Sequence, residues 1–365
     1  MRILLVQFEC LNWLQGRSYP YCLNFAFKES LEKLGIEVVI ITTPWLPYLE
    51  RICEGKIFDQ IWLNDLSHFA DFNLDLSIVK NLAPVRLGFI TESLEYDEKA
   101  YQNFSWLQYR RQGIEKQLEN VTHIVAVDEE DVINLHQRLK LPTMWLPVSI
   151  PEGLICTQNK PSRYNLAFFS GSLYGERQEL LENKKLNSLL KQNHLSNDNY
   201  IYSLFFNLLP RHQYLRLDKF TNYPLHLIYP LYLQLLRNIR YSAFMAWQKQ
   251  VLQSGFAVVN LPHLVKGYST RVIEGIAALR PVISWEIPDR PLNKAIFENG
   301  KEILLYSTAE ELGEQINYIL SNPQLAEKIA INAQEKVKKW HTTEKRMTQI
   351  LFWIEHNETP NYGIN

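Results

Sequence analysis

"STRVIEGIAALRPVIS", residues 269–284, combines the clearest helix and strand signals of the chain. Ser269 and Thr270 are residue types that often begin helices. Pro281 then ends the helical run, and residues 282–284 have the composition of a buried strand. The apolar side chains of the predicted helix recur at helical spacing, and they are Val272, Ile273, Ile276 and Leu279. The segment therefore predicts a helix that leads directly into a buried strand.

Two charged residues lie near the start of this predicted helix, although its neighbours are apolar. Arg271 and Glu274 are three residues apart, so they share one face of the helix. One interpretation is that they simply pair with each other at the surface. The other is that Glu274 accepts hydrogen bonds from two neighbouring hydroxyls, which is the geometry that a ribose diol offers. Both interpretations stay open at this point.

Strand and helix signals alternate on both sides of a polar stretch at residues 156–163, which predicts a linker between two domains. Nearly continuous apolar strands that alternate with helices indicate parallel sheets covered on both faces. We therefore expect an α/β protein with domains at 1–158 and 159–341 and a terminal segment at 342–365. The predicted strands lie at 2–9, 36–44, 58–65, 85–93, 123–131 and 143–151, and again at 164–170, 257–261, 280–286 and 302–307.

Composition narrows the class of function. The 365 residues carry a formal net charge of −1, with 46% hydrophobic and 21% charged residues, so a nucleic-acid partner is not expected. The four cysteines are scattered, which argues against a zinc site and a disulfide scaffold. The first ten residues resemble a strand more than a signal peptide, so we expect a cytoplasmic protein. Contact with a membrane surface stays open.

The loop at 168–177, "FFSGSLYGER", follows a predicted strand and begins a helix. Gly171 and Gly175 would let a ligand approach the backbone, and the helix start would favour an anion. Arg177 could then hold a diphosphate through two parallel hydrogen bonds. The alternative is a tight turn with a solvated arginine.

Acidic residues follow the predicted fourth strand. Glu92 lies where a parallel sheet presents the edge that usually carries catalytic groups, although the acidic residues that follow it favour a solvated acidic loop. Residues 128–131, "DEED", are interpreted as favourable charge at a helix start and not as a metal site. The isolated histidines, His263 among them, are interpreted as structural.

Several of these segments together resemble the nucleotide-sugar-binding half of GT-B glycosyltransferases, with the CgeB-like group related to glycosyltransferase family 4 as the nearest match. The resemblance covers roughly residues 164–352 and rests on the order of its motifs. These are the Gly-Ser turn with a following arginine, the Arg-x-x-Glu helix start, the Pro-Val-Ile strand, a segment "GKEILLY", and a His-Thr-x-x-x-Arg pattern at 341–346.

The resemblance implies two Rossmann-like domains that face a cleft, with a C-terminal helix crossing back to the first domain. It implies donor binding by the second domain without an obligatory metal or other cofactor. Glu274 matches the glutamate that holds the ribose, Tyr268 is placed to stack on the base or sugar, and Arg271 is placed near the phosphates. The donor-binding residues that it implies are Gly171, Ser172, Leu173, Arg177, Lys266, Gly267, Tyr268, Ser269, Thr270, Arg271 and Glu274.

The sequence departs from the pattern at two positions. Lys266 stands where retaining relatives commonly have a glutamate, and Arg280 stands where they have a glycine. We therefore expect a metal-independent glycosyltransferase with a UDP-sugar as the donor and Glu92 as an acceptor base or sugar-orienting group. A non-catalytic sugar- or nucleotide-binding protein and a nucleotide-sugar epimerase are the alternatives.

The acceptor is not identified by the sequence. Residues 12–22 and 185–240 lie outside the shared motifs, so we expect them to shape the acceptor pocket. The second stretch is predicted to be helical, although its periodicity is weak. The tryptophan and tyrosine content of the two stretches suits an aromatic or apolar acceptor. A small natural product, a peptide and a lipid-linked glycan all fit this composition.

Overall fold

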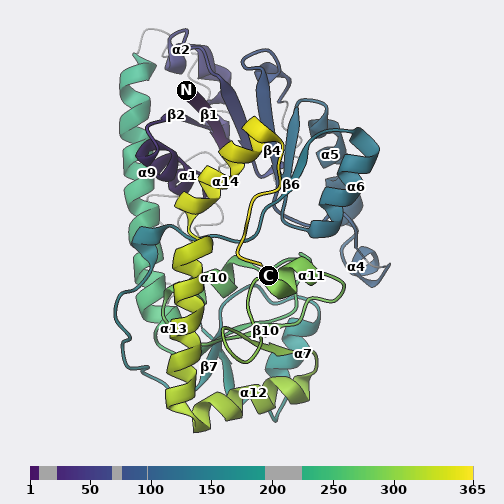
Figure 1. The fold of residues 1–365 in the computed structure, drawn as a ribbon, viewed down its shortest axis with the longest axis vertical. Helices are drawn as coiled ribbons and strands as arrows, with labels where there is room; N and C mark the ends of the chain where they lie inside the picture. Colours follow the sequence, from purple (N-terminus) through teal and green to yellow (C-terminus); the bar gives the residue numbers. More distant parts are fainter. Residues whose placement is uncertain (8–22, 68–75, 97, 194–223, 365) are drawn as a thin grey trace. The chain divides into compact units, whose positions relative to one another are not determined.

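A computed structural model describes residues 1–7, 23–67, 76–96, 98–193 and 224–364 (Figure 1). Contacts divide the chain into two compact units. The first holds the described residues of 1–126, 134–144 and 196–244, and the second holds those of 127–133, 145–195 and 245–365. The predicted domain boundaries at 158 and 341 stay predictions.

The first unit contains a six-stranded sheet in the order β2-β1-β3-β4-β5-β6. Strands β1 to β5 pair in parallel, as the apolar runs predicted. The strands are β1 (Arg2–Gln7), β2 (Glu37–Thr42), β3 (Gln60–Asn64), β4 (Val85–Ile90), β5 (His123–Ala126) and β6 (Thr143–Trp145). The helices associated with them are α1 (Leu23–Lys33), α2 (Leu49–Cys53), α4 (Glu98–Asn103), α5 (Trp106–Leu118) and α6 (Glu129–Leu139).

The second unit contains a five-stranded parallel sheet in the order β11-β10-β9-β7-β8. Its strands are β7 (Ala167–Phe169), β8 (Leu190–Gln192), β9 (Ala257–Asn260), β10 (Val282–Trp285) and β11 (Leu304–Tyr306). Its helices are α7 (Glu176–Glu182), α10 (Thr270–Ala277), α11 (Pro291–Ala295), α12 (Ala309–Ser321), α13 (Pro323–Trp340) and α14 (Thr343–His356).

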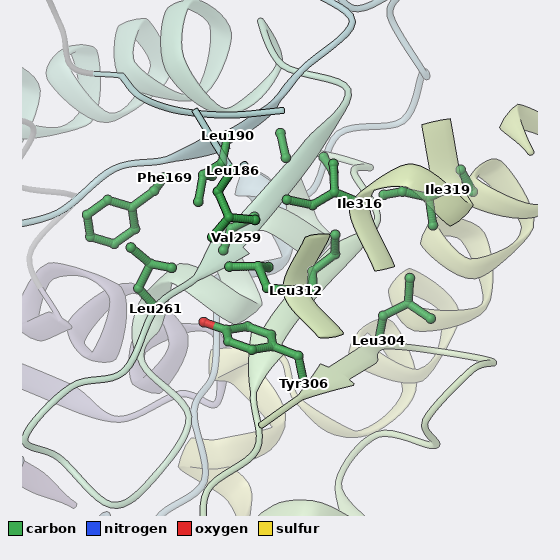
Figure 2. Packing of buried hydrophobic residues seen from close by; sticks show 14 of the residues in the cluster. Phe169, Leu186, Leu190, Val259, Leu261, Leu304, Tyr306, Leu312, Ile316 and Ile319 are labelled. Atoms are coloured by element: carbon green, nitrogen blue, oxygen red, sulfur yellow. The ribbon is translucent and has the colours of Figure 1, made fainter. Parts of the chain in front are cut away.

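The core of the second unit lies between its sheet and helix α12. Figure 2 shows Val259 and Leu261 of the β9 segment packed near Leu312 and Ile316 of α12, with Phe169 of β7 beside them. Helix α12 begins with a capping box, because the Thr308 hydroxyl accepts from the Glu311 amide while the Glu311 carboxylate accepts from the Thr308 amide. A well-fixed helix start and an apolar face together hold α12 against the strands.

Helix α9 (Leu225–Trp247) continues into a π-helical turn, Gln248–Leu252, just before β9. Its residues 225–244 belong to the first unit, where the Tyr229 hydroxyl accepts from the Thr42 amide at 2.8 Å. The helix ends at Trp247, whose side chain is fully buried in the second unit. π-helical turns inside or beside α-helices are rare and often occur near functional sites.

The two parallel sheets predicted from the apolar runs are confirmed. The helix predicted within 269–284 is also confirmed, because α10 and β10 occupy this stretch. Helix α9 begins within 185–240, the stretch predicted to be helical, whereas strand β8 and helices α4 and α5 were not predicted. The predicted acceptor region 12–22 and most of 185–240 lie outside the described residues.

The chain end is anchored by a buried arginine in the second unit. Arg346 of α14 is fully buried, and it donates to the carbonyl of Val148 at 3.4 Å and lies near Nδ1 of His341 at 3.2 Å. Its guanidinium also lies 4.9 Å from the centre of the Tyr362 ring. The predicted His-Thr-x-x-x-Arg pattern therefore joins α14 to the segment that follows β6.

Candidate functional site

The loops predicted to bind a ligand follow neighbouring parallel strands of the second unit. Strand β9 pairs with β7 on one side and with β10 on the other. The carboxyl ends of parallel strands meet at one edge of a sheet, which is where α/β proteins commonly bind ligands. The loop before α7 and the loop before α10 therefore lie at the same edge.

Helix α10 begins without a side-chain cap. Ser269 has the extended backbone conformation of a capping residue, with φ −70° and ψ 160°, but its side chain accepts no hydrogen bond from the helix. Its hydroxyl instead donates to Oδ1 of Asn260 at 2.7 Å. Because helix starts attract anions, an uncapped start at the ligand-binding edge can receive a phosphate.

The carboxylate of Glu274 is buried within α10. The residue is 4% exposed, and Nη1 of Arg271 donates to its Oε2 at 2.8 Å. Burial raises the pKa of Glu274 to about 7, and the charge of Arg271 opposes that shift. The pairing of Arg271 with Glu274 that the sequence suggested is therefore present, but it is a largely buried pair and not a solvated one.

The ring of Trp247 packs against Arg271 of this pair. The guanidinium carbon of Arg271 lies 4.3 Å from the centre of its ring, a distance at which a cation and an aromatic face attract each other. Its indole N–H donates to Oγ of Ser170, directly after β7, at 3.4 Å. Trp247 thus contacts both loops. It lies beyond the stretch at 185–240 and outside every motif identified in the sequence, so only the fold reveals its position.

Arg177 lies at the same edge and is 8% exposed. Its Nε donates to the carbonyl of Pro262 at 2.5 Å, and its Nη1 donates to the carbonyl of Ser172 at 3.0 Å. The guanidinium also lies over the Tyr174 ring, 4.2 Å from its centre. Among the described residues no carboxylate pairs with it. Burial lowers the pKa of Arg177, and the charge of Arg271 lowers it further, so two cations lie near each other here.

His263 adjoins this pair of arginines. Burial lowers the pKa of His263 to about 3, with the charge of Arg177 acting in the same direction, so the ring is neutral at neutral pH. It packs edge-on against Trp285, with ring centres 6.0 Å apart. Nothing in the sequence separates His263 from the other isolated histidines.

The remaining predicted donor residues surround α10 and α7. Lys266 is half-buried and Thr270 is exposed, while Ser172 and Leu173 lie exposed in the loop before α7. Tyr268 is 5% exposed and packs against Phe297, so its contact with a base or sugar stays a prediction.

Close packing or backbone conformation explains why glycine occurs at several positions in and beside these loops. A Cβ at Gly171 would lie 2.7 Å from the Phe169 ring, and one at Gly267 would lie 3.0 Å from the carbonyl of Val127. Gly175 has φ +53°, a conformation that favours glycine. At Gly275 a Cβ would lie 2.9 Å from Val282 Cγ2, so glycine lets α10 approach β9 and β10 closely.

Arg280, the second departure from the expected pattern, has a structural role. It is 4% exposed and donates to Asn159 Oδ1 at 2.8 Å and to the carbonyls of Lys160 and Gln253 at 2.6 and 2.7 Å. These bonds fasten the predicted linker to the end of α10. Arg280, which stands where the family pattern has a glycine, therefore anchors this segment. Its hydrogen bonds do not involve Arg177, Arg271 or Glu274.

Glu92 lies in the first unit, two residues after β4, where it forms an ion pair with Arg110. The guanidinium of Arg110 also lies over the Trp106 ring, 4.3 Å from its centre. The structure therefore brings together Arg177, Arg271 and Glu274 in the second unit, whereas Glu92 belongs to a separate set of contacts.

Two general features of the described residues bear on the kind of site. No group of three or more His, Cys, Asp or Glu side chains in that part of the chain is arranged to hold a metal ion. Likewise, none of the described helices is both long enough and apolar enough to span a bilayer.

Comparison with known proteins identifies the fold. Two parallel Rossmann-like sheets in one chain define the GT-B architecture, and the chain matches solved structures of this class over nearly its full length. One is sucrose-phosphate synthase from Thermosynechococcus elongatus, with a TM-score of 0.57, 12% identity, and coverage of 98% of this chain and 100% of the other. Another is HepE from Anabaena, with a TM-score of 0.52, 14% identity, and coverage of 96% and 99%.

Sequence comparison gives a narrower match within the chain. Residues 226–352 match the model of a family described as Glycosyl transferase-like. Glycosyltransferase 1 domain-containing protein 1 from Xenopus tropicalis is 31% identical over 94 residues, which cover 26% of this chain and 26% of that relative. The stretch 226–352 contains Trp247, α10 and most of α14, so Arg271 and Glu274 lie within it and Arg177 lies outside it.

Proposed function

We propose that this chain is a glycosyltransferase that moves a sugar from a UDP-sugar to an acceptor hydroxyl. The observation that carries the proposal is the cluster of Arg177, Arg271 and buried Glu274 beside the uncapped start of α10. The match of residues 226–352 to a glycosyltransferase-like family supports it. The choice of nucleotide is supported by HepE, a structure of the same fold that contains UDP-glucose.

In this proposal the nucleotide lies at the edge of the second sheet. Glu274 accepts hydrogen bonds from the two ribose hydroxyls, and the start of α10 and the guanidinium of Arg177 face the diphosphate. Arg271 holds the carboxylate of Glu274 in place through its 2.8 Å hydrogen bond. Lys266, in the loop before α10, adds positive charge near the phosphates.

The reaction breaks the bond between the anomeric carbon and the diphosphate and forms a bond from that carbon to the acceptor oxygen. Negative charge develops on the departing UDP, and fixed cations and amide dipoles stabilise such charge most effectively in a water-poor site. We propose that the arginines and the α10 start provide this assistance without an obligatory metal. Glu92 is the proposed acceptor of the hydroxyl proton or the group that orients the sugar.

The test is calorimetric titration with UDP, GDP and dTDP. We expect UDP to bind most tightly and Glu274→Gln to weaken UDP binding about ten-fold, because a neutral amide accepts the ribose hydroxyls less strongly. Glu179→Gln is the matched control, since Glu179 is an exposed glutamate of α7. If the folded wild-type protein binds none of the three nucleotides, the proposal is wrong.

A non-catalytic nucleotide-binding protein is the second candidate, and Lys266 favours it because a glutamate is expected at this position in retaining enzymes. The two candidates differ in turnover. Transfer or slow hydrolysis of a UDP-sugar, unchanged by a chelator, supports the metal-independent enzyme, whereas tight UDP binding without any sugar release supports the binding protein.

A further inference from the structure

The hydroxyl of Ser269 is turned away from the helix that its backbone is placed to cap. A serine in this extended conformation commonly accepts a hydrogen bond from the amide two or three residues later, which stabilises the helix start. Here the hydroxyl donates to Oδ1 of Asn260 instead, at 2.7 Å. The start of α10 consequently lacks the side-chain cap that its own sequence could supply.

Asn260 is fixed by its neighbours in the sheet. It is the last residue of β9 and is 2% exposed, and its Nδ2 donates to Oγ of Ser284 on β10 at 2.9 Å. The hydroxyl of Tyr306 on β11 donates to its backbone carbonyl at 3.1 Å. With the amide group held from the β10 side, Oδ1 has a defined direction and provides a fixed acceptor for Ser269.

The Ser269 hydroxyl could form a competing hydrogen bond by rotation about a single bond. If Ser269 lost its acceptor, turning about its Cα–Cβ bond would bring the hydroxyl to the first amides of α10, where a serine cap is favourable. That self-cap would occupy the position that a phosphate oxygen needs. Arg177 adds a positive charge at the same edge of the sheet that no carboxylate of the described chain neutralises, because the partners of its guanidinium are the carbonyls of Pro262 and Ser172.

We propose that Asn260 is a positioning residue of the donor site: it holds the Ser269 hydroxyl against β9 and so keeps the start of α10 uncapped for the diphosphate of the donor. This inference rests on the proposed function. It assigns Asn260 an effect on ligand binding that operates through Ser269, without contact between Asn260 and the nucleotide.

The experiment compares four proteins: wild type, Asn260→Leu, Ser269→Gly and the double variant. Leucine has a similar volume to asparagine and removes the acceptor, so Ser269 is released to cap α10. We expect UDP affinity, measured by calorimetry, to fall about five-fold in Asn260→Leu, the equivalent of ~1 kcal/mol for a serine cap. Ser269 is itself a predicted donor-binding residue, so Ser269→Gly is the reference for the double variant. Glycine has no hydroxyl to form the cap, so the UDP affinity of the double variant should lie within about two-fold of that of Ser269→Gly.

The controls separate this effect from general damage. Thermal melts establish that each protein is folded. Asn260→Ser replaces the leucine variant if leucine prevents folding. Equal UDP binding by wild type and a folded Asn260 variant, or an equally large loss on Asn260→Leu in the Ser269→Gly background, overturns the inference while leaving the proposed function intact. Failure of wild type to bind any nucleoside diphosphate refutes the proposed function itself.

Discussion

Arg271 and Glu274 form an ion pair within one turn of α10, and the guanidinium that holds the carboxylate is itself held against the indole of Trp247. A carboxylate that is 4% exposed is costly to ionise, which explains why burial raises its pKa to about 7 in spite of the neighbouring cation. The net charge of the pair therefore changes near neutral pH, where the Glu274 carboxyl gains or loses its proton.

This raised pKa predicts a pH-dependent contribution to stability. The unfolded carboxyl releases its proton near its ordinary value of 4.5, whereas the folded one keeps it up to about pH 7. The folded state therefore binds more protons between these values, and the stability that Glu274 contributes declines as pH rises through this window. The unfolding free energy of wild type relative to Glu274→Gln, measured in urea, should decrease from pH 4.5 to 7. A constant difference would contradict the prediction.

His341 predicts the opposite trend. Burial, with Arg346 and Lys336, lowers its pKa from 6.5 to about 3, so the folded ring stays neutral while the unfolded ring takes up a proton. Its contribution to stability is complete above about pH 6.5 and is lost as pH falls toward 3. His341→Asn should therefore lose less stability on acidification than wild type does, as followed by urea denaturation. The control is His136→Asn, which makes the same replacement at an exposed histidine of α6.

Arg177 predicts a requirement for guanidinium geometry. Lysine keeps the charge but cannot donate to two carbonyls and a phosphate at once, so Arg177→Lys should weaken UDP binding about ten-fold. Arg163→Lys is the matched control, because Arg163 also lies over a tyrosine ring, 5.2 Å from its centre, but is exposed. Calorimetry with UDP and uridine separates the effects. Equal losses for both ligands would place Arg177 away from the diphosphate.

Arg280 predicts an effect on stability alone. Arg280→Gly would introduce the residue expected from the family pattern and would remove the hydrogen bonds to Asn159, Lys160 and Gln253. Because hydrogen bonds of a charged donor contribute about 1.5–3 kcal/mol each, we expect a loss of more than ~2 kcal/mol in urea denaturation. Asn159→Ala, which removes one partner, should cost less. A change in the UDP affinity of the folded variant would show that the anchor also acts on the site.

Part of this arrangement could be predicted from the sequence because the controlling interactions are local. The apolar runs are long enough to identify buried parallel strands, and 269–284 contains its own helix signals, so α10 and β10 were located correctly. The loop after β7 was recognised from its glycines and Arg177. The contacts of these residues, such as the bond from Arg177 to the carbonyl of Pro262, depend on which strands become neighbours.

The residues that were missed depend on distant parts of the chain. Trp247 reaches Arg271 and Ser170 only after β7, β9 and α10 have assembled, and nothing in its own sequence window indicates this. Asn260 carried a usable signal, because a polar residue at the end of a buried strand commonly points at the functional edge of the sheet. The burial of Tyr268 against Phe297 depends on the position of a segment nearly thirty residues later.

The close packing of α10 against the sheet at Gly275 determines how deeply the Glu274 carboxylate is buried. A methyl group at this position would lie 2.9 Å from Val282 and 3.0 Å from Val258, so even alanine would force α10 away from the strands by some tenths of an ångström. The ligand that this edge of the sheet accepts could therefore be changed by varying Val258 and Val282, the strand residues that contact the helix. A smaller side chain there lets α10 move closer to the sheet, and a larger one pushes α10 away from it.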